Sequence, residues 1–180
     1  MSDVYLKDII EKFDEFLVAH GVSFEGIAVG GAALILLGVT DRKTRDVDLL
    51  NDEIPLDVTR LAKEFAAKQG LPENWLNNGP SDLTQYLPAH WIARTVPLFS
   101  GKALMLRALG RTDLLKTKVW AFCDRPGDLA DIVALNPSPA ELLDALCWVK
   151  PLDANPSWPE FVERVGKEIE KAIGISHAKY

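Results

Sequence analysis

Two segments decide the fold: Val29-Gly30-Gly31-Ala32-Ala33-Leu34 and, after a loop, Arg45-Asp46-Val47-Asp48-Leu49-Leu50. Residues 24–29 form a short apolar run that predicts a buried strand, and the glycine pair then predicts a turn into a helix over residues 32–37. In the second segment apolar and acidic residues alternate, as they do in a β-strand. Side chains two residues apart on a strand share a face, so Asp46 and Asp48 are expected to project together.

Helical periodicity precedes this unit and returns after it. Residues 4–20 place apolar side chains at helical spacing, and a second amphipathic helix is expected from about Pro55 to Gln69. Residues 71–88 are rich in Pro, Asn and Gly and predict a loop with a short strand near Trp75. The polar face expected for the first helix comprises Lys7, Glu11, Lys12, Asp14 and Glu15.

The last third of the chain differs from the first two. Residues 94–99 and 103–109 predict a hairpin, whereas the pattern after Arg111 is helical over 112–123, 127–135, 139–149 and 159–173. This order predicts an α/β (α+β) fold, with a mixed sheet flanked by helices and a helical C-terminal part. A length of 180 residues suits one domain, with a core at about 22–110 and the helical part at about 111–180.

Composition and charge exclude several classes of protein. The net charge of −6 would repel a phosphate backbone, so any nucleic acid must bind a local basic patch or a metal. The longest apolar run, residues 27–39, is too short to span a bilayer, and we expect no membrane segment. Two cysteines without a metal or redox spacing, and no leader pattern, favour the cytoplasm. The glycines match neither the dinucleotide-binding nor the P-loop pattern.

The two deciding segments together indicate phosphoryl chemistry. Asp46 and Asp48 on one strand face can bridge divalent cations, and such a pair suits metal-assisted phosphoryl transfer. Gly30 and Gly31 lack side chains, so their backbone N–H groups can approach a phosphate at the start of the following helix. Either feature alone has an ordinary structural explanation, as a solvated acidic pair or a tight corner. Side by side in sequence, they predict a site for a metal-bound triphosphate.

At these residues the chain resembles the nucleotidyltransferase superfamily of DNA polymerase beta, whose pattern is hydrophobic-Gly-Gly/Ser followed by Asp-hydrophobic-Asp/Glu. It is more similar still to bacterial abortive-infection AbiE-type toxins, which carry Gly-Gly-Ala-Ala-Leu and then Arg-x-Thr-x-Asp-hydrophobic-Asp. The matching residues are 30–34 and 42–48. A later helix, residues 113–121, and an acidic segment, residues 128–132, extend the resemblance to roughly residues 22–135.

The resemblance implies roles for individual residues and for partners. Asp46 and Asp48 would hold Mg²⁺ (or Mn²⁺), and Gly30 and Gly31 would cradle the phosphates of a nucleoside triphosphate. Lys118 would neutralise charge on the transferred group; the alternative is a solvated surface lysine. The acceptor would be a hydroxyl on RNA, protein or a small molecule, and the toxin-like group implies a cognate antitoxin or other partner protein.

The basic loop before the acidic strand adds further candidates. Thr44 and Arg45 are predicted to contact the nucleotide, because Arg42, Lys43 and Arg45 make this loop suited to phosphate or RNA. A merely solvated loop is the alternative.

One departure from the family pattern concerns the base. Active members place a third carboxylate on a later strand, and the predicted hairpin strands contain none. Asp82 and Asp128 are the candidate substitutes. Asp128 shares a helix face with Asp131, and the two could either complete the acidic site or favour the helix N-terminus. Without such a base, the chain would be a catalytically inactive nucleotide- or partner-binding module of the same fold.

Overall fold

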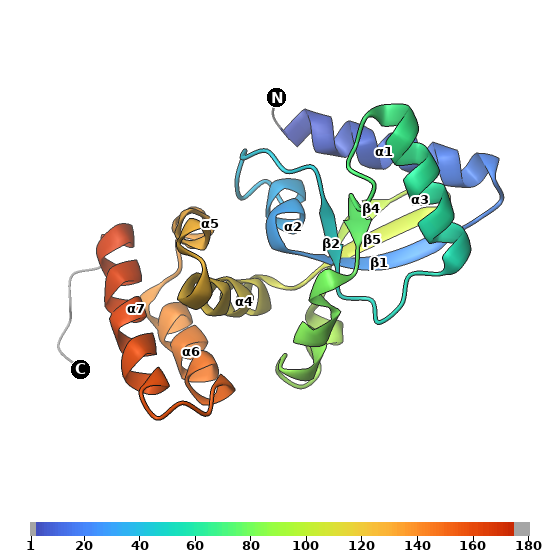
Figure 1. The fold of residues 1–180 in the computed structure, drawn as a ribbon. Helices are drawn as coiled ribbons and strands as arrows, with labels where there is room; N and C mark the ends of the chain where they lie inside the picture. The colour runs from blue at the N-terminus through green and yellow to red at the C-terminus, as the bar shows by residue number, and fades with distance from the viewer. Residues whose placement is uncertain (1–2, 175–180) are drawn as a thin grey trace. The chain divides into compact units, whose positions relative to one another are not determined.

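The computed structural model describes residues 3–174 and divides into two compact units. The first unit ends at Gly110 and the second begins at Arg111, where the sequence pattern changes from strands to helices. Figure 1 shows the helices and strands of both units. The elements of the first are α1 (Asp3–Ala19), β1 (Phe24–Val29), α2 (Gly30–Leu36), β2 (Val47–Leu49), α3 (Leu56–Gln69), β3 (Leu76–Asn77), η1 (Gly79–Gln85), η2 (Trp91–Arg94), β4 (Val96–Ser100) and β5 (Leu104–Ala108).

The strands of the first unit form one mixed sheet in the order β3-β2-β1-β5-β4. The apolar strand β1 lies at the centre, antiparallel to β2 and parallel to β5. β3 runs parallel to β2 at one edge, and β4 pairs antiparallel with β5 at the other. The predicted mixed sheet flanked by helices is therefore confirmed. The acidic strand is shorter than expected, because β2 begins at Val47 and Asp46 lies just before it.

An aromatic cluster holds the helices of the first unit beside the sheet. α1 and α3 lie next to each other (Figure 1), and the ring of Phe13 in α1 lies 5.2 Å from that of Phe65 in α3. Trp75 packs edge-on against Phe13 at 5.1 Å and donates its indole N–H to the carbonyl of Ala62 at 3.0 Å. Burying these large rings removes apolar surface from water and anchors the segment that leads into β3.

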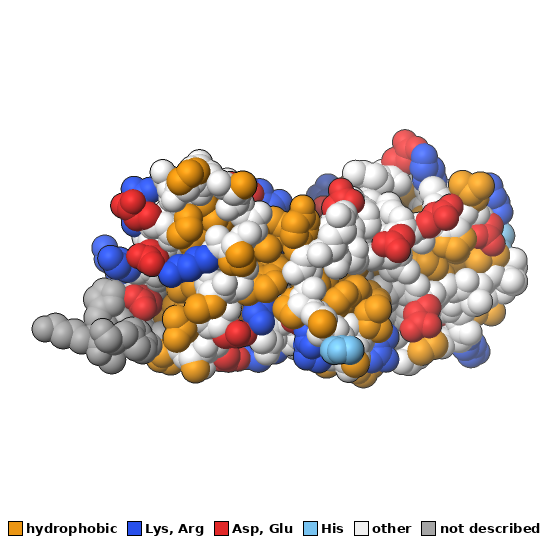
Figure 2. Space-filling model, turned by 90° about the horizontal axis from the view of Figure 1, so that it is seen from below, with side chains coloured by type: hydrophobic (Ala, Val, Ile, Leu, Met, Phe, Trp, Pro, Cys, Tyr) orange, Lys and Arg blue, Asp and Glu red, His pale blue; other side chains and the backbone are white. Residues whose placement is uncertain are grey.

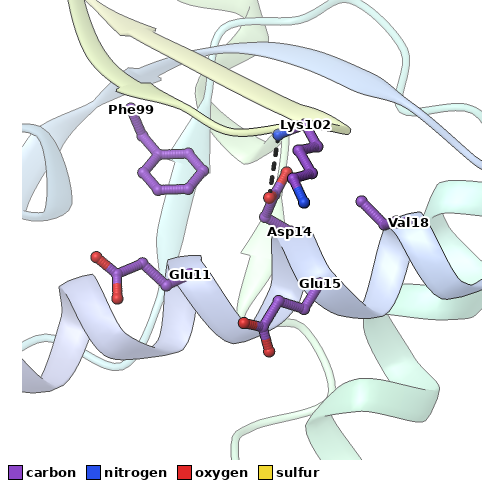
Figure 3. A pocket seen from close by; sticks show the side chains of 6 residues that line it. All are labelled: Glu11, Asp14, Glu15, Val18, Phe99 and Lys102. Carbon is purple, nitrogen blue, oxygen red and sulfur yellow. Dashed lines mark hydrogen bonds between the residues drawn. The ribbon is translucent and has the colours of Figure 1, made fainter.

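Asp14 corrects one expectation for α1. Its periodicity places Asp14 on the polar face, yet the residue is only 8 % exposed. Its carboxylate accepts hydrogen bonds from the backbone N–H groups of Lys102, Ala103 and Leu104, at 3.1, 2.8 and 2.7 Å, in the turn between β4 and β5 (Figure 3). Burial opposes ionisation of this carboxyl, but the three N–H groups prevail and lower the pKa of Asp14. The carboxylate thus closes the hairpin turn from the neighbouring helix.

We expect Asp14→Ala to lower the free energy of unfolding by about 2–3 kcal/mol, because three turn N–H groups would lose a charged acceptor. Since the folded pKa lies below the unfolded one, this contribution is present above about pH 4 and is lost as pH falls further. Urea unfolding at pH 7 and pH 3 measures both effects. Asp14→Asn keeps an acceptor oxygen and should cost less, and Glu15→Gln, on the exposed side of α1, should cost nothing. Equal effects of Asp14→Ala and Glu15→Gln would contradict the assignment.

The second unit consists of helices held by an ionic contact at its start. The Arg111 guanidinium donates to Glu141 at 2.8 Å and to the carbonyl of Leu135 at 2.7 Å. This contact and the N–H of Ser138, which begins a capping box with Glu141, lower the pKa of Glu141 to about 2. The elements are α4 (Arg111–Asp124), η3 (Pro126–Asp128), α5 (Leu129–Leu135), α6 (Pro139–Val149), η4 (Lys150–Leu152) and α7 (Trp158–Ile173).

The surface mixes charged and apolar side chains. Figure 2 shows acidic, basic and hydrophobic groups interspersed on one face. The most exposed large apolar residues include Leu56 at the start of α3 and Ile92 in η2. Over residues 3–174, no helix combines the length and the apolar composition that crossing a bilayer requires.

Candidate functional site

The turn from β1 into α2 needs its two glycines for different reasons. Gly30 has a φ of +71°, a backbone conformation that strains any residue with a Cβ. A Cβ on Gly30 would also lie only 3.2 Å from Oδ2 of Asp48. Gly31 has no positive φ, but a Cβ there would lie 2.2 Å from Nη2 of Arg42. The first glycine permits the turn, and the second makes room for a guanidinium.

The two predicted carboxylates stand beside this turn. Asp48 lies in the middle of β2, opposite Val29 on β1, so sheet pairing places it at the residue that precedes Gly30. Asp46 lies just before β2 and is exposed, whereas the intervening Val47 is fully buried. This alternation of exposure agrees with the expected common face for Asp46 and Asp48. The structure therefore brings Gly30 and Asp48 together, as the sequence predicted.

Hydrogen bonds orient both carboxylates. The hydroxyl of Thr44 donates to Oδ1 of Asp46. The side-chain amide of Asn77 donates to Oδ1 of Asp48 at 3.0 Å, and the carbonyl oxygen of the same amide accepts from the N–H of Gly79 at 2.9 Å. The parallel pairing of β2 and β3 sets Asn77 directly opposite Asp48. Each acid therefore accepts a hydrogen bond from a neutral donor, which belongs to the same loop for Asp46 and to the neighbouring strand for Asp48.

Two predicted nucleotide contacts lie in the loop before β2. Thr44 is partly exposed and bonds Asp46, so its hydroxyl sits within the acidic site. Arg45 is exposed at the bend before β2. Of the basic residues in this loop, Arg42 supplies the three atoms nearest to the Cβ position of Gly31.

Lys118 and Asp128 meet each other within the second unit. The Lys118 ammonium lies 2.8 Å from Oδ1 of Asp128 and 2.6 Å from Oδ2 of Asp131. Lys118 is 5 % exposed, so the alternative of a solvated surface lysine is wrong. The shared face expected for Asp128 and Asp131 serves to hold this lysine. Lys116 points elsewhere, as expected, and pairs with Asp144 at 2.8 Å.

Among the described residues, the position opposite Asp48 on the neighbouring strand is not a carboxylate. The strand next to β2 on its outer side is β3, where Asn77 occupies the position opposite Asp48. Asp82 lies in η1, exposed, with its carboxylate near the amide of Gln85 at 3.4 Å. Within the part of the chain that the structure describes, no group of three or more His, Cys, Asp or Glu is placed to hold a metal ion.

The donor chemistry at this site nevertheless fits Mg²⁺ or Mn²⁺. Asp46 and Asp48 offer carboxylate oxygens, the ligands that hard cations prefer. Mg²⁺ is commonly held by one or two carboxylates together with substrate phosphates and water, and does not require a cage made of protein alone. The pair therefore suits an ion that is shared with a nucleotide.

A separate groove in the first unit contains none of the predicted site residues. It lies between α1 and the β4–β5 turn and has a volume of about 340 Å³ (Figure 3). The lining residues are Glu11, Asp14, Glu15, Val18, Phe99 and Lys102.

Sequence reasoning missed two asparagines, one beside Asp48 and one that joins β2 to β1. Asn77 belongs to a two-residue strand inside a segment whose composition predicts a loop, although the apolar pair Trp75-Leu76 before it is a signal for a strand. Asn51 follows β2 and bonds β1 with its side chain, accepting from the N–H of Ile27 and donating to the carbonyl of Glu25, both at 3.0 Å. No local pattern marks such a contact between strands.

Comparison with protein families finds a match over most of the chain. Residues 5–140 match a family model described as "Nucleotidyltransferase of unknown function (DUF6036)". The matched region contains the glycine turn, the acidic strand and α4. No curated protein and no solved structure matches the chain.

Proposed function

Because the chain belongs to the DUF6036 family of nucleotidyltransferases, whose substrate is a nucleotide, we propose that the β1–α2 turn and Asp46/Asp48 form its active site. There the protein would transfer a nucleoside monophosphate from a nucleoside triphosphate to a hydroxyl on RNA, protein or a small molecule. The observation that carries this proposal is the 3.2 Å approach of Asp48 to the Cβ position of Gly30. It joins an acidic strand and a glycine turn into one site.

Within this proposal, Asp46 and Asp48 hold Mg²⁺ or Mn²⁺, which when bound would neutralise phosphate charge and orient the triphosphate. Gly30 and Gly31 let the backbone approach the phosphates, and Thr44 and Arg45 border the same site. The acceptor oxygen forms a bond to the α-phosphorus while the bond to pyrophosphate breaks, and the hydroxyl proton leaves to a base.

The biological setting we propose follows from the resemblance to AbiE-type toxins. Residues 30–34 and 42–48 support that closer relationship. It implies a toxin–antitoxin role, with a cognate antitoxin or another partner protein. Co-expression of neighbouring open reading frames, followed by growth assays and purification of complexes, tests this role. Growth inhibition that depends on Asp46 and Asp48 would support it, and unimpaired growth on overexpression would oppose it.

One observation favours a second function, a catalytically inactive module that binds nucleotide or a partner. Asn77 lies where a carboxylate on the neighbouring strand would stand beside Asp48. An amide at this position orients Asp48 but accepts no proton from an attacking hydroxyl. Binding of nucleotide would then be retained without transfer.

The two functions are distinguished by one assay. The protein is incubated with each α-³²P-labelled nucleoside triphosphate, Mg²⁺ or Mn²⁺, and RNA, protein or small-molecule acceptors, and both label transfer and pyrophosphate release are measured. Turnover that disappears in the Asp46→Ala/Asp48→Ala double variant supports the enzyme. Calorimetric binding with no pyrophosphate release under any condition supports the inactive module. Turnover unaffected by the double variant would overturn the proposed site.

A further inference from the structure

We infer that Arg42 is a phosphate-binding residue of this site, an inference that rests on the proposed function. The basis is the contact between its guanidinium and the glycine turn. Measured from the position that a Cβ of Gly31 would occupy, Nη2 lies at 2.2 Å, Cζ at 3.0 Å and Nε at 3.3 Å. A side chain at residue 31 would collide with this group, so the guanidinium lies directly against the turn.

The position of Arg42 means that a positive and a negative side chain both lie beside the glycine turn. At Gly31 the neighbouring group is the Arg42 cation, and at Gly30 it is the Asp48 carboxylate. A triphosphate approaching two carboxylates is repelled unless cations offset them. The planar guanidinium binds phosphate oxygens through two parallel N–H bonds, which also fixes their orientation. Arg42 therefore supplies, from the protein itself, positive charge at the turn.

The structure separates Arg42 from the other basic residues of its loop. All three atoms nearest to the Cβ position of Gly31 belong to Arg42. Lys43 and Arg45 are exposed side chains of the same loop. The loop thus contains one cation that is set against the turn, and Arg60, an exposed arginine of α3 that is not among the predicted site residues, serves as the matched control.

The same contact explains why residue 31 is a glycine. Its backbone does not require glycine, unlike that of Gly30. Arg42 is exposed and its guanidinium is the far end of a flexible side chain, so a methyl group at residue 31 would displace the guanidinium without unfolding the chain. Gly31→Ala is therefore a second way to move Arg42 while leaving its charge in place.

The test measures binding of inorganic triphosphate in the presence of Mg²⁺ by calorimetry, a probe that does not depend on the preferred base. We expect Arg42→Ala to raise the Kd at least about tenfold, through loss of a charge-assisted bidentate contact. Arg42→Lys keeps the charge but loses the bidentate geometry of the guanidinium, so its Kd should lie between those of the unmodified protein and Arg42→Ala. Gly31→Ala should weaken binding as well, and Arg60→Ala, which removes an exposed guanidinium from α3, should change the Kd less than about twofold. Thermal unfolding without ligand shows that each variant is folded at the temperature of the binding measurement.

Each other outcome overturns the inference. An unchanged Kd for Arg42→Ala, together with loss of binding in Asp48→Asn, would remove Arg42 from the site and leave the proposed function standing. Equal losses for Arg42→Ala and Arg60→Ala would show that only the net charge of the protein matters. No binding by the unmodified protein of either inorganic triphosphate or any nucleoside triphosphate would overturn the proposed function together with this inference.

Discussion

Asp48→Asn is expected to reduce nucleotidyl transfer by about 10³-fold, which corresponds to about 4 kcal/mol of lost transition-state stabilisation. The substitution removes the negative charge that would hold a divalent cation but preserves the shape of the side chain. The amide of Asn77 can still donate to the remaining carbonyl oxygen at residue 48. The fold should therefore survive, and initial rates of label transfer at saturating Mg²⁺ measure the loss of chemistry alone.

Asp52→Asn is the matched control for Asp48→Asn. Asp52 is exposed a few residues after β2, and its backbone carbonyl, which the substitution leaves intact, accepts from the amide of Asn78 at 3.0 Å. It removes the same charge from the same region and should leave the rate within about twofold. If both variants slowed transfer equally, the effect would come from general electrostatics and Asp48 would have no special role.

The largest expected effect on stability belongs to Lys118. Its ammonium neutralises Asp128 and Asp131, whose side chains are 11 % and 1 % exposed. Lys118→Ala leaves two carboxylates without their shared cation and should cost about 3–5 kcal/mol in the free energy of unfolding. Chemical unfolding followed by tryptophan fluorescence and circular dichroism measures this loss.

Two further variants separate stability from catalysis at Lys118. Combining Lys118→Ala with Asp131→Asn also removes the negative charge of the more buried carboxylate. The double variant should therefore be more stable than Lys118→Ala alone. Lys116→Ala breaks a pair whose acid, Asp144, is 55 % exposed, and should cost about 1 kcal/mol or less. The predicted role in neutralising the transferred group requires a second result, namely slower transfer by Lys118→Ala at a temperature where the variant is folded. Full activity there would restrict Lys118 to holding the second unit together.

The sequence predicted the centre of the first unit well because local signals and packing agree there. A short apolar run that ends at a glycine pair is typical of a buried strand followed by a turn. β1 is observed over the predicted residues. The alternation around Asp46 and Asp48 placed both acids on the correct face, although β2 covers only three residues. At these positions, burial of alternate side chains decides the orientation, and burial can be inferred from residue types.

The features that the sequence did not predict depend on partners that are distant in sequence. Asp14 looks like any solvated acid of an amphipathic helix, and its acceptor role arises only when the β4–β5 turn folds against it. Asn77 is meaningful only after β3 pairs with β2. The lysine of α4 looked like a surface residue or a catalytic one, and the two acids that bury it come from η3 and α5. In each case a polar side chain bonds to a partner that cannot be inferred from the periodicity of the sequence.

The anchoring of the hairpin turn by Asp14 also sets an order for events during protein synthesis. The bonds from Ala103 and Leu104 to Asp14 join residues 89 and 90 positions apart. The paired residues of β1 and β5 are 80 positions apart, as Phe24 and Leu104 are. A ribosome therefore has to release nearly all of the first unit before its central strand pair can form, and such distant contacts make folding slow. The second unit depends on closer pairs, such as Lys118 with Asp128 ten residues later, and can fold soon after it emerges. In a chain that stalls before residue 103, β1 has an edge that is not paired with β5, and Asp14 lacks the N–H groups of the β4–β5 turn. Unpaired strand edges of this kind are the features that chaperones and proteases encounter in unfinished proteins.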